Sequence, residues 1–91
     1  IYGSYGYTGQ LITQECKSKN LSVILSGRNR EQLQRQSDAT GYPFEVVDIA
    51  DHLALVRLLN RGKVVIHCGG PFRHTAQAMV NACLETKTHY T

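Results

Sequence analysis

Three glycines spaced three residues apart mark a turn near the start of the chain. Gly3, Gly6 and Gly9 stand between an apolar start and a run of residues typical of a helix. The first glycine allows a sharp exit from a strand, the second lets the main chain approach a bulky anion without a Cβ, and the third lets a helix pack closely on a sheet. N–H groups in the first turn of such a helix favour phosphate oxygens. The pattern therefore predicts a diphosphate site formed by Gly3, Ser4, Tyr5, Gly6, Tyr7, Thr8 and Gly9. Because the G-x-x-G-x-x-G spacing is one residue longer than the dinucleotide-binding fingerprint, a glycine-rich turn without a ligand is the alternative.

Arginines, rather than a carboxylate, follow the second predicted strand in the segment Gly27, Arg28, Asn29 and Arg30. A carboxylate there would accept hydrogen bonds from both ribose hydroxyls and repel a 2′-phosphate, whereas a guanidinium binds phosphate oxygens and stacks on adenine. We therefore expect NADP as the cofactor, with NAD as the second choice. Arg28 is the main expected contact, supported by Asn29 and Arg30. The alternative is that both arginines are solvated charges of a turn.

Two further strand-to-helix loops are expected at the same edge of the sheet. Asp48 ends the third predicted strand, where its carboxylate accepts either from an adenine amino group or from N–H groups of its own turn. The fourth strand runs into a Gly-Gly-Pro turn, whose glycines allow close approach to the ribose and nicotinamide. An ordinary strand-to-helix turn is again the alternative. The expected contacts in this loop are Cys68, Gly69, Gly70, Pro71 and Phe72.

The sequence identifies no catalytic group and no metal site. The histidines lack an H-x-x-x-H spacing and the cysteines lack a C-x-x-C pair, so zinc is disfavoured. Cys68 has no recognisable base beside it, which favours a buried thiol over a nucleophile. His67 is expected as a hydrogen-bonded residue of the core or the sheet edge. A P-loop motif is absent, as is a tyrosine followed four residues later by lysine.

Strand-like and helix-like segments alternate along the chain with short loops between them. This alternation predicts one α/β domain over residues 1–91, a Rossmann-type doubly wound parallel sheet with spatial strand order 3-2-1-4. Ligands of such sheets bind at the carboxyl ends of the strands, where the order reverses. The strands are expected at residues 1–2, 21–26, 44–48 and 63–68, and the helices at residues 10–19, 31–38, 51–62 and 72–86.

Some finer features of these helices are also predicted. Thr8 is a candidate cap for the first helix and Asp51 for the third. The third helix is expected to bury Leu53, Val56 and Leu59, widened by Leu55 and Leu58, because they share one face. The fourth is expected to bury Ala76, Met79, Val80, Cys83 and Leu84.

Composition excludes several classes of function. Ten Lys and Arg against seven Asp and Glu give a formal charge of +3, without a basic run, so nucleic acid is not the expected partner. No apolar run approaches the roughly 18 residues of a membrane span, so no membrane signal is present. Three unpaired cysteines indicate reduced thiols, from which we expect a cytoplasmic protein.

The two ends of the chain interrupt the pattern. The first predicted strand has two residues, no initiating Met precedes it, and residues 88–91 read as a strand just beginning. We therefore expect a truncated fragment of a longer protein, with the substrate domain outside it. An unpaired sheet edge would favour self-association, so a homo-oligomer is a further expectation.

The chain resembles the N-terminal domain of the saccharopine dehydrogenase-like oxidoreductases, a group that includes trans-acting enoyl reductases. Five segments carry this resemblance, in the same order along the chain: residues 3–9, 25–33, 65–72, 82–85 and 88–90. The resemblance implies an NAD(P)-binding Rossmann domain and a second domain that supplies the substrate site. Four positions depart from the usual family residues: His67 stands in place of Asn, His74-Thr75 in place of Tyr-Gly, and Lys87 in place of Gly. These departures concern the nicotinamide side of the site.

The sequence thus predicts the NADP-binding domain of an oxidoreductase that transfers hydride to or from a small-molecule substrate. In such enzymes the cofactor carries the chemistry and the protein orients it. A non-catalytic dinucleotide sensor or a protein-interaction module with the same fold is the alternative. The isolated fragment is not expected to be active.

Overall fold

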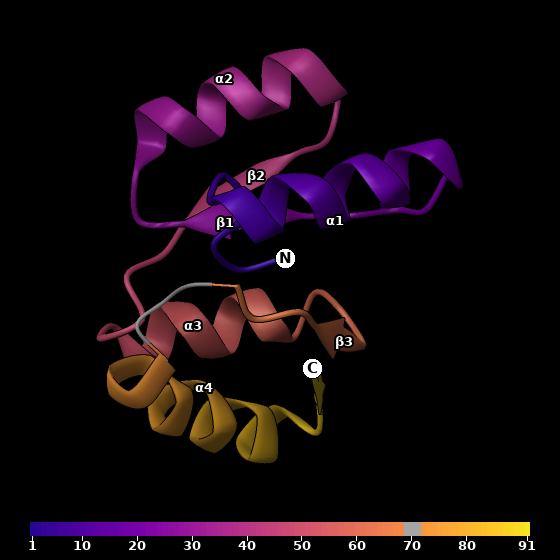
Figure 1. Cartoon of the computed structure of the whole chain (residues 1–91). Coiled ribbons are helices and arrows are strands. Elements are labelled where there is room, and N and C mark those ends of the chain that lie inside the picture. Colours follow the sequence, from indigo (N-terminus) through magenta and orange to yellow (C-terminus); the bar gives the residue numbers. More distant parts are fainter. Residues whose placement is uncertain (69–71) are drawn as a thin grey trace.

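The computed structural model describes residues 1–68 and 72–91, with side chains described up to residue 68 and again from residue 76. Helices and strands alternate as the sequence predicted (Figure 1). The helices are α1 (Tyr7–Ser18), α2 (Arg30–Thr40), α3 (His52–Leu59) and α4 (Phe72–Thr86), and the strands are β1 (Leu25–Gly27), β2 (Phe44–Val46), β3 (Val64–Val65) and β4 (His89–Tyr90).

The regular strands form two parallel pairs. β1 pairs with β2, with Leu25 opposite Phe44, and β3 pairs with β4, with Val64 opposite His89. In Figure 1 the pair β1–β2 lies with α1 and α2, and β3 lies with α3 and α4. The fold is therefore α/β with short parallel strands, as expected. The single sheet with strand order 3-2-1-4 is not confirmed, because the strands form two separate sheets.

Tyr2 lies between the two pairs and contacts both. It forms isolated parallel bridges to Ser26 and to His67. Its N–H donates to the Ile66 carbonyl at 3.0 Å, and its carbonyl accepts from the Cys68 N–H at 2.7 Å. The Tyr2 hydroxyl donates to the buried Val47 carbonyl at 2.8 Å. The main chain that leads into the glycine turn is thus held from both sides.

Apolar side chains of α3 and α4 form most of the core around Tyr2. The buried cluster consists of Tyr2, Val47, Leu55, Leu58, Leu59, Val65, Met79, Ala82 and Cys83. Burial of such side chains, at about 25 cal/mol per Å² of apolar surface, is the main driving force for this arrangement. This burial holds α3 and α4 against Tyr2 and does not include the residues of the predicted phosphate turn.

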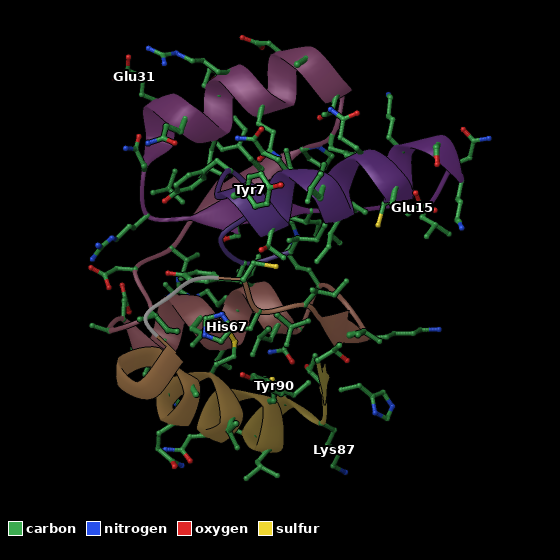
Figure 2. All side chains as sticks on the ribbon, in the orientation of Figure 1. Tyr7, Glu15, Glu31, His67, Lys87 and Tyr90 are labelled. Carbon is green, nitrogen blue, oxygen red and sulfur yellow. The ribbon has the colours of Figure 1, made fainter. Side chains whose placement is uncertain are left out.

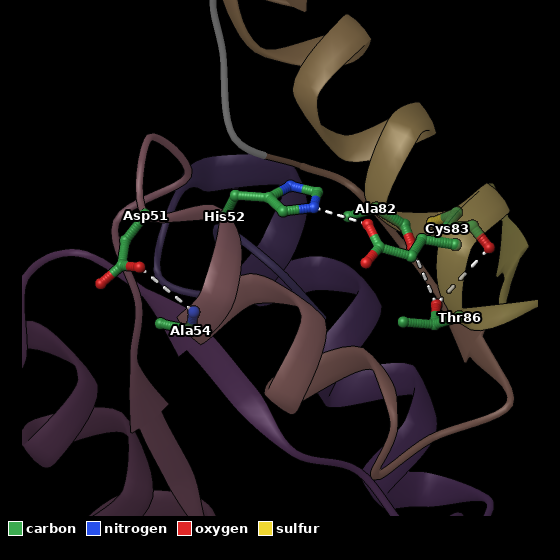
Figure 3. Close-up of polar contacts among 7 residues, drawn as sticks. Asp51, His52, Ala54, Ala82, Cys83 and Thr86 are labelled. Carbon is green, nitrogen blue, oxygen red and sulfur yellow. Dashed lines mark hydrogen bonds and ion pairs between the residues drawn. The ribbon is translucent and has the colours of Figure 1, made fainter.

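Polar contacts fix the beginning of α3 and its position beside α4 (Figure 3). Asp51 accepts a hydrogen bond from the Ala54 N–H at 3.2 Å, which confirms it as the helix cap. His52 Nε2 lies 2.6 Å from Glu85 Oε2, so an exposed pair joins the two helices. The Thr86 hydroxyl donates to the Ala82 carbonyl at 2.9 Å near the end of α4.

Several boundaries differ from those predicted. α1 begins at Tyr7 rather than residue 10, because Gly6 takes the capping position with extended backbone (φ −70°, ψ 172°). Thr8 therefore lies inside the helix, and its predicted role as a cap was wrong. β1 begins at Leu25 rather than residue 21, because the Leu21 N–H donates back to the Cys16 carbonyl at 3.0 Å and completes the end of α1.

Two leucines predicted to be buried are exposed. Leu53 is 69% exposed and Leu84 is 75% exposed. The buried face of α3 is formed instead by Leu55, Leu58 and Leu59, which face α4. The error at Leu53 arose because α3, a short helix rich in leucine, has more apolar residues than one face can bury.

Candidate functional site

Backbone conformation explains one glycine of the opening turn and close packing explains another. Gly3 has a φ of +81°, a conformation that glycine adopts without strain. Gly9 is buried, and a Cβ at this position would lie 2.8 Å from the main chain of Ser4. Gly6 differs, since its φ is negative and a Cβ there would meet one described atom within 4 Å, the Gly3 carbonyl oxygen at 3.5 Å. The described chain therefore does not require glycine at Gly6, although glycine is common at the helix-capping position that it takes.

The N-terminus of α1 is suited to an anion. Gly6 caps the helix without a side-chain hydrogen bond, and the first turn of this fully described helix has no acidic residue. Main-chain N–H groups of the first turn carry a partial positive charge. Tyr7 is 84% exposed and Thr8 is also exposed, so solvent reaches this turn (Figure 2).

The end of β1 adjoins the opening turn through main-chain and side-chain contacts. The N–H groups of Gly3 and Ser4 donate to the Ser26 carbonyl at 2.8 and 3.2 Å. The Tyr5 ring lies directly against Gly27, and its hydroxyl oxygen accepts from the Asn29 N–H at 3.2 Å. The predicted phosphate turn and the predicted arginine loop are thus side by side.

Arg28 lies at the tip of this loop and is exposed. Burial chiefly, and then the Asp48 carboxylate, raise the pKa of the Tyr2 phenol. Arg28 opposes this rise. Arg28 follows β1 and Asp48 follows β2, and because these strands are parallel both residues lie at the same end of the pair, beside the opening turn that contacts Ser26 and Gly27.

The other polar residues of the β1 loop already have partners. The Asn29 side chain accepts from the Gln32 N–H at 3.1 Å and caps α2. The Arg30 guanidinium lies over the Phe44 ring, 6.0 Å from its centroid. Arg28 is consequently the stronger candidate for a contact with a phosphate, and the supporting roles of Asn29 and Arg30 stay predictions.

The Ser4 side chain faces α2 rather than solvent. It is fully buried, its hydroxyl donates to Gln36 Oε1 at 2.7 Å, and the Gln36 amide donates back to the Ser4 carbonyl at 2.8 Å. The Ser4 hydroxyl is therefore not exposed to a cofactor, and its predicted contact stays a prediction. Sequence reasoning missed Gln36, because a glutamine in a polar helix gives no signal of such a role.

Asp48 has a role within its own turn. Its carboxylate accepts from the Ala50 N–H at 2.9 Å, and its carbonyl accepts from the Asp51 N–H at 2.8 Å. This matches the alternative in which the acid stabilises the turn. A contact with adenine stays a prediction, since the carboxylate is exposed and has a second oxygen.

The fourth loop is described in part. Burial raises the pKa of the Cys68 thiol, which keeps it protonated at neutral pH and disfavours a nucleophilic role. Gly69, Gly70 and Pro71 lie outside the described residues. Phe72 begins α4, but its side chain lies outside the described range.

His67 is a core residue. It is buried, and its ring lies edge-on to the rings of Tyr2 and Tyr90, at centroid distances of 5.8 and 6.1 Å. Burial lowers the pKa of its imidazole. Within the described residues no three His, Cys, Asp or Glu side chains are grouped to hold a metal ion.

Two cavities lie at different ends of the strands. A polar groove of about 580 Å³ between α1 and α2 reaches the opening turn, and is lined by Tyr5, Gln10, Asn29 and Gln36 among others. A more apolar cavity of about 690 Å³ is lined by residues that precede β1, including Leu21, and by residues at the start of β3, including Val64. The larger cavity is therefore remote from the predicted site.

These features define an α/β domain of the Rossmann-like class, with a glycine turn at a helix N-terminus and parallel strands. Its fold matches apo saccharopine dehydrogenase (L-Glu forming) of Saccharomyces cerevisiae, with a TM-score of 0.86 and 22% identity over 98% of this chain and 20% of that chain. It also matches isoflavone reductase, with a TM-score of 0.84 and 20% identity over 99% of this chain and 33% of that chain. At these identities the likeness concerns the fold.

The chain belongs to the saccharopine dehydrogenase NADP binding domain family, whose model matches residues 1–91. It is 30% identical to the human saccharopine dehydrogenase-like oxidoreductase, over 93% of this chain and 24% of the relative. It is 27% identical to a probable mitochondrial saccharopine dehydrogenase-like oxidoreductase of Arabidopsis thaliana, over 99% of this chain and 23% of the relative. A lipid droplet localized protein of Caenorhabditis elegans is 31% identical, over 93% of this chain and 23% of the relative. The chain spans about a quarter of the length of these relatives, and the family resemblance inferred from the motifs is confirmed.

Within the described residues, no helix has both the length and the apolar character needed to cross a bilayer.

Proposed function

We propose that this chain binds NADP(H) as the cofactor domain of a saccharopine dehydrogenase-like oxidoreductase. The observation that carries the proposal is the contact between Tyr5 of the opening turn and the β1 loop at Gly27 and Asn29. This contact brings a helix N-terminus suited to a diphosphate next to an exposed arginine suited to a 2′-phosphate. Membership of an NADP-binding family supports the same conclusion.

The residues have separate roles in this proposal. Main-chain N–H groups of the first turn of α1, at Tyr7, Thr8 and Gly9, bind the diphosphate, because those of Gly3, Ser4 and Gly6 already donate within the protein. Gly6 leaves room for the approach of the diphosphate. Arg28 binds the 2′-phosphate, while Asp48 and the loop at residues 68–72 contact the adenine and the nicotinamide side. The bound cofactor supplies the hydride, and this chain holds and orients it. A small-molecule substrate, rather than a nucleic acid, is the proposed partner, and its site lies in another part of the protein.

We further propose that the two strand pairs and the first residues form one sheet. In it the four predicted strands, residues 44–48, 21–26, 1–2 and 63–68, lie side by side in this order, which is the predicted order 3-2-1-4. The bridges from Tyr2 to Ser26 and to His67 support this order, because they place the first segment between the second and the fourth. The cytoplasmic location and self-association stay predictions.

Titration of NADPH and NADH against the protein and its Arg28→Ala variant tests this function. NADPH should bind more tightly than NADH, because a phosphate–guanidinium contact adds roughly 1.5–3 kcal/mol. Arg28→Ala should weaken NADPH about tenfold or more and NADH less than twofold. Arg57→Ala removes the same charge from an exposed position on α3 and should change neither affinity. Equal affinity of the unaltered protein for the two cofactors would remove the role given to Arg28.

A further inference from the structure

Tyr5 contacts the residues on both sides of Arg28. Its ring lies against Gly27, so closely that a Cβ at Gly27 would stand 3.0 Å from Tyr5 Cζ and Oη and still closer to the ring edge. Its hydroxyl oxygen accepts from the Asn29 N–H at 3.2 Å. One side chain from the opening turn therefore fixes the main chain before and after the arginine.

The contact with Gly27 explains why the strand ends in glycine. Gly27 is fully paired in β1, opposite Val46, and its φ does not demand glycine. The space of its missing Cβ is filled by the Tyr5 ring. Glycine at this position is therefore a consequence of Tyr5, and the two residues form one packing unit.

The hydrogen bond to Asn29 fixes the other side of the arginine. Asn29 caps α2 through its side chain, so its main chain already belongs to the start of a helix. The Tyr5 hydroxyl binds the N–H of this same residue. The main-chain position of Arg28 relative to the opening turn is thus set from the strand and from the helix together.

Ser4 anchors the same turn to α2. Its reciprocal hydrogen bonds with Gln36 join the turn to the middle of that helix. Because Tyr5 follows Ser4, its ring is presented from a turn that is itself held. The turn, the β1 loop and α2 therefore form one connected unit.

We propose that Tyr5 is a positioning residue that sets the preference for NADPH over NADH. It acts through the main chain beside Arg28, by holding the root of the arginine at a fixed place next to the diphosphate turn. A guanidinium whose root is fixed loses less conformational freedom when it binds a phosphate. This inference rests on the proposed function, because it concerns the same site.

Tyr5→Phe tests the inference, since it keeps the ring against Gly27 and removes the hydroxyl that accepts from Asn29. We expect the Kd for NADPH to rise about fivefold, as loss of one hydrogen bond predicts, and the Kd for NADH to change less than twofold. The matched control is Tyr42→Phe. The Tyr42 hydroxyl also forms one hydrogen bond to the main chain, but as the donor, to the carbonyl of Leu21 at 2.6 Å, and it lies at the larger cavity. It should leave the ratio of the two Kd values unchanged.

A second variant separates positioning from folding. Tyr5→Ala removes both the ring and the hydroxyl, and should lower the NADPH preference further while circular dichroism reports the helices intact. An unchanged ratio of the two Kd values in Tyr5→Phe, or an equal weakening of both cofactors, would overturn the inference. If the unaltered protein shows no preference for NADPH, the proposed function itself fails, and that result is visible before any Tyr5 variant is measured.

Discussion

His67 packs in the core of the structure. It is buried between the rings of Tyr2 and Tyr90, in agreement with the place predicted for it from the sequence, and burial lowers the pKa of its imidazole. The folded protein therefore favours the neutral ring, whereas the unfolded chain protonates near pH 6.5. The contribution of His67 to the free energy of unfolding is therefore highest above about pH 6.5, where the ring is neutral in both states, and it decreases as the pH falls below this value.

Replacement of His67 tests this reading. The melting temperature of the protein should fall between pH 7.0 and pH 5.5, because the unfolded state binds more protons in this window. His67→Asn should reduce that fall, whatever it does to the melting temperature at pH 7.0, since asparagine does not titrate. His89→Asn changes an exposed histidine and should keep the full pH dependence. An unchanged pH dependence in His67→Asn would contradict the account.

The residue types predicted which residues would contact the cofactor, but not which of their polar atoms already form hydrogen bonds within the protein. Arg28 is exposed at the predicted place, whereas Ser4, Asn29 and Asp48 each satisfy a main-chain or side-chain group of the protein. Such partners lie far apart in the sequence or depend on a helix start, so spacing alone does not reveal them. Tyr5 was predicted as a contact, but its packing on Gly27 depends on the approach of two loops.

At the scale of elements, the opening turn and α1 act together. The helix begins at Tyr7, three residues earlier than predicted, so the last of the three glycines lies inside it. Gly9 packs its main chain against Ser4, and Gly3 makes the turn. Within the described chain Gly6 has neither a positive φ nor a close contact that excludes a Cβ. The three glycines should therefore respond differently to substitution.

Substitution of Gly9 and Gly6 tests this difference. Gly9→Ala places a methyl group 2.8 Å from the Ser4 main chain and should cost about 1–3 kcal/mol in the free energy of unfolding. Gly6→Ala should cost less than about 1 kcal/mol, as its backbone and its 3.5 Å contact are ordinary. Gly6→Val should abolish binding of NADPH and NADH while circular dichroism stays largely native. Urea unfolding measures the first two, and a larger loss in Gly6→Ala than in Gly9→Ala would refute the division of roles.

Patterns of apolar residues predicted the elements better than their ends. α4 begins and ends at the predicted residues, and Asp51 caps α3 as expected. The strands are shorter than predicted, because a strand ends where its partner ends, and this depends on pairing between distant segments. The buried faces were predicted in part, since Leu53 and Leu84 are exposed.

At the scale of the whole molecule, Tyr2 joins two halves that each contain a strand pair. The pair β1–β2 with α1 and α2 carries the opening turn and Arg28, and the pair β3–β4 with α3 and α4 carries most of the core (Figure 1). Alternation predicted this α/β class and the meeting of the loops at one end of the strands. The predicted strand order is not confirmed, since strand order depends on which segments pair. The larger cavity at the other end of the strands was not predicted.

The central claim is that the opening turn binds the diphosphate and the β1 loop distinguishes NADPH from NADH. The most direct measurement is a map of amide chemical-shift changes when each cofactor is added to the labelled protein. Both cofactors should shift the amides of residues 3–9, and NADPH should shift those of Gly27, Arg28 and Asn29 more than NADH does. Identical maps for the two cofactors, or changes centred on Leu21 and Val64 at the larger cavity, would contradict the claim.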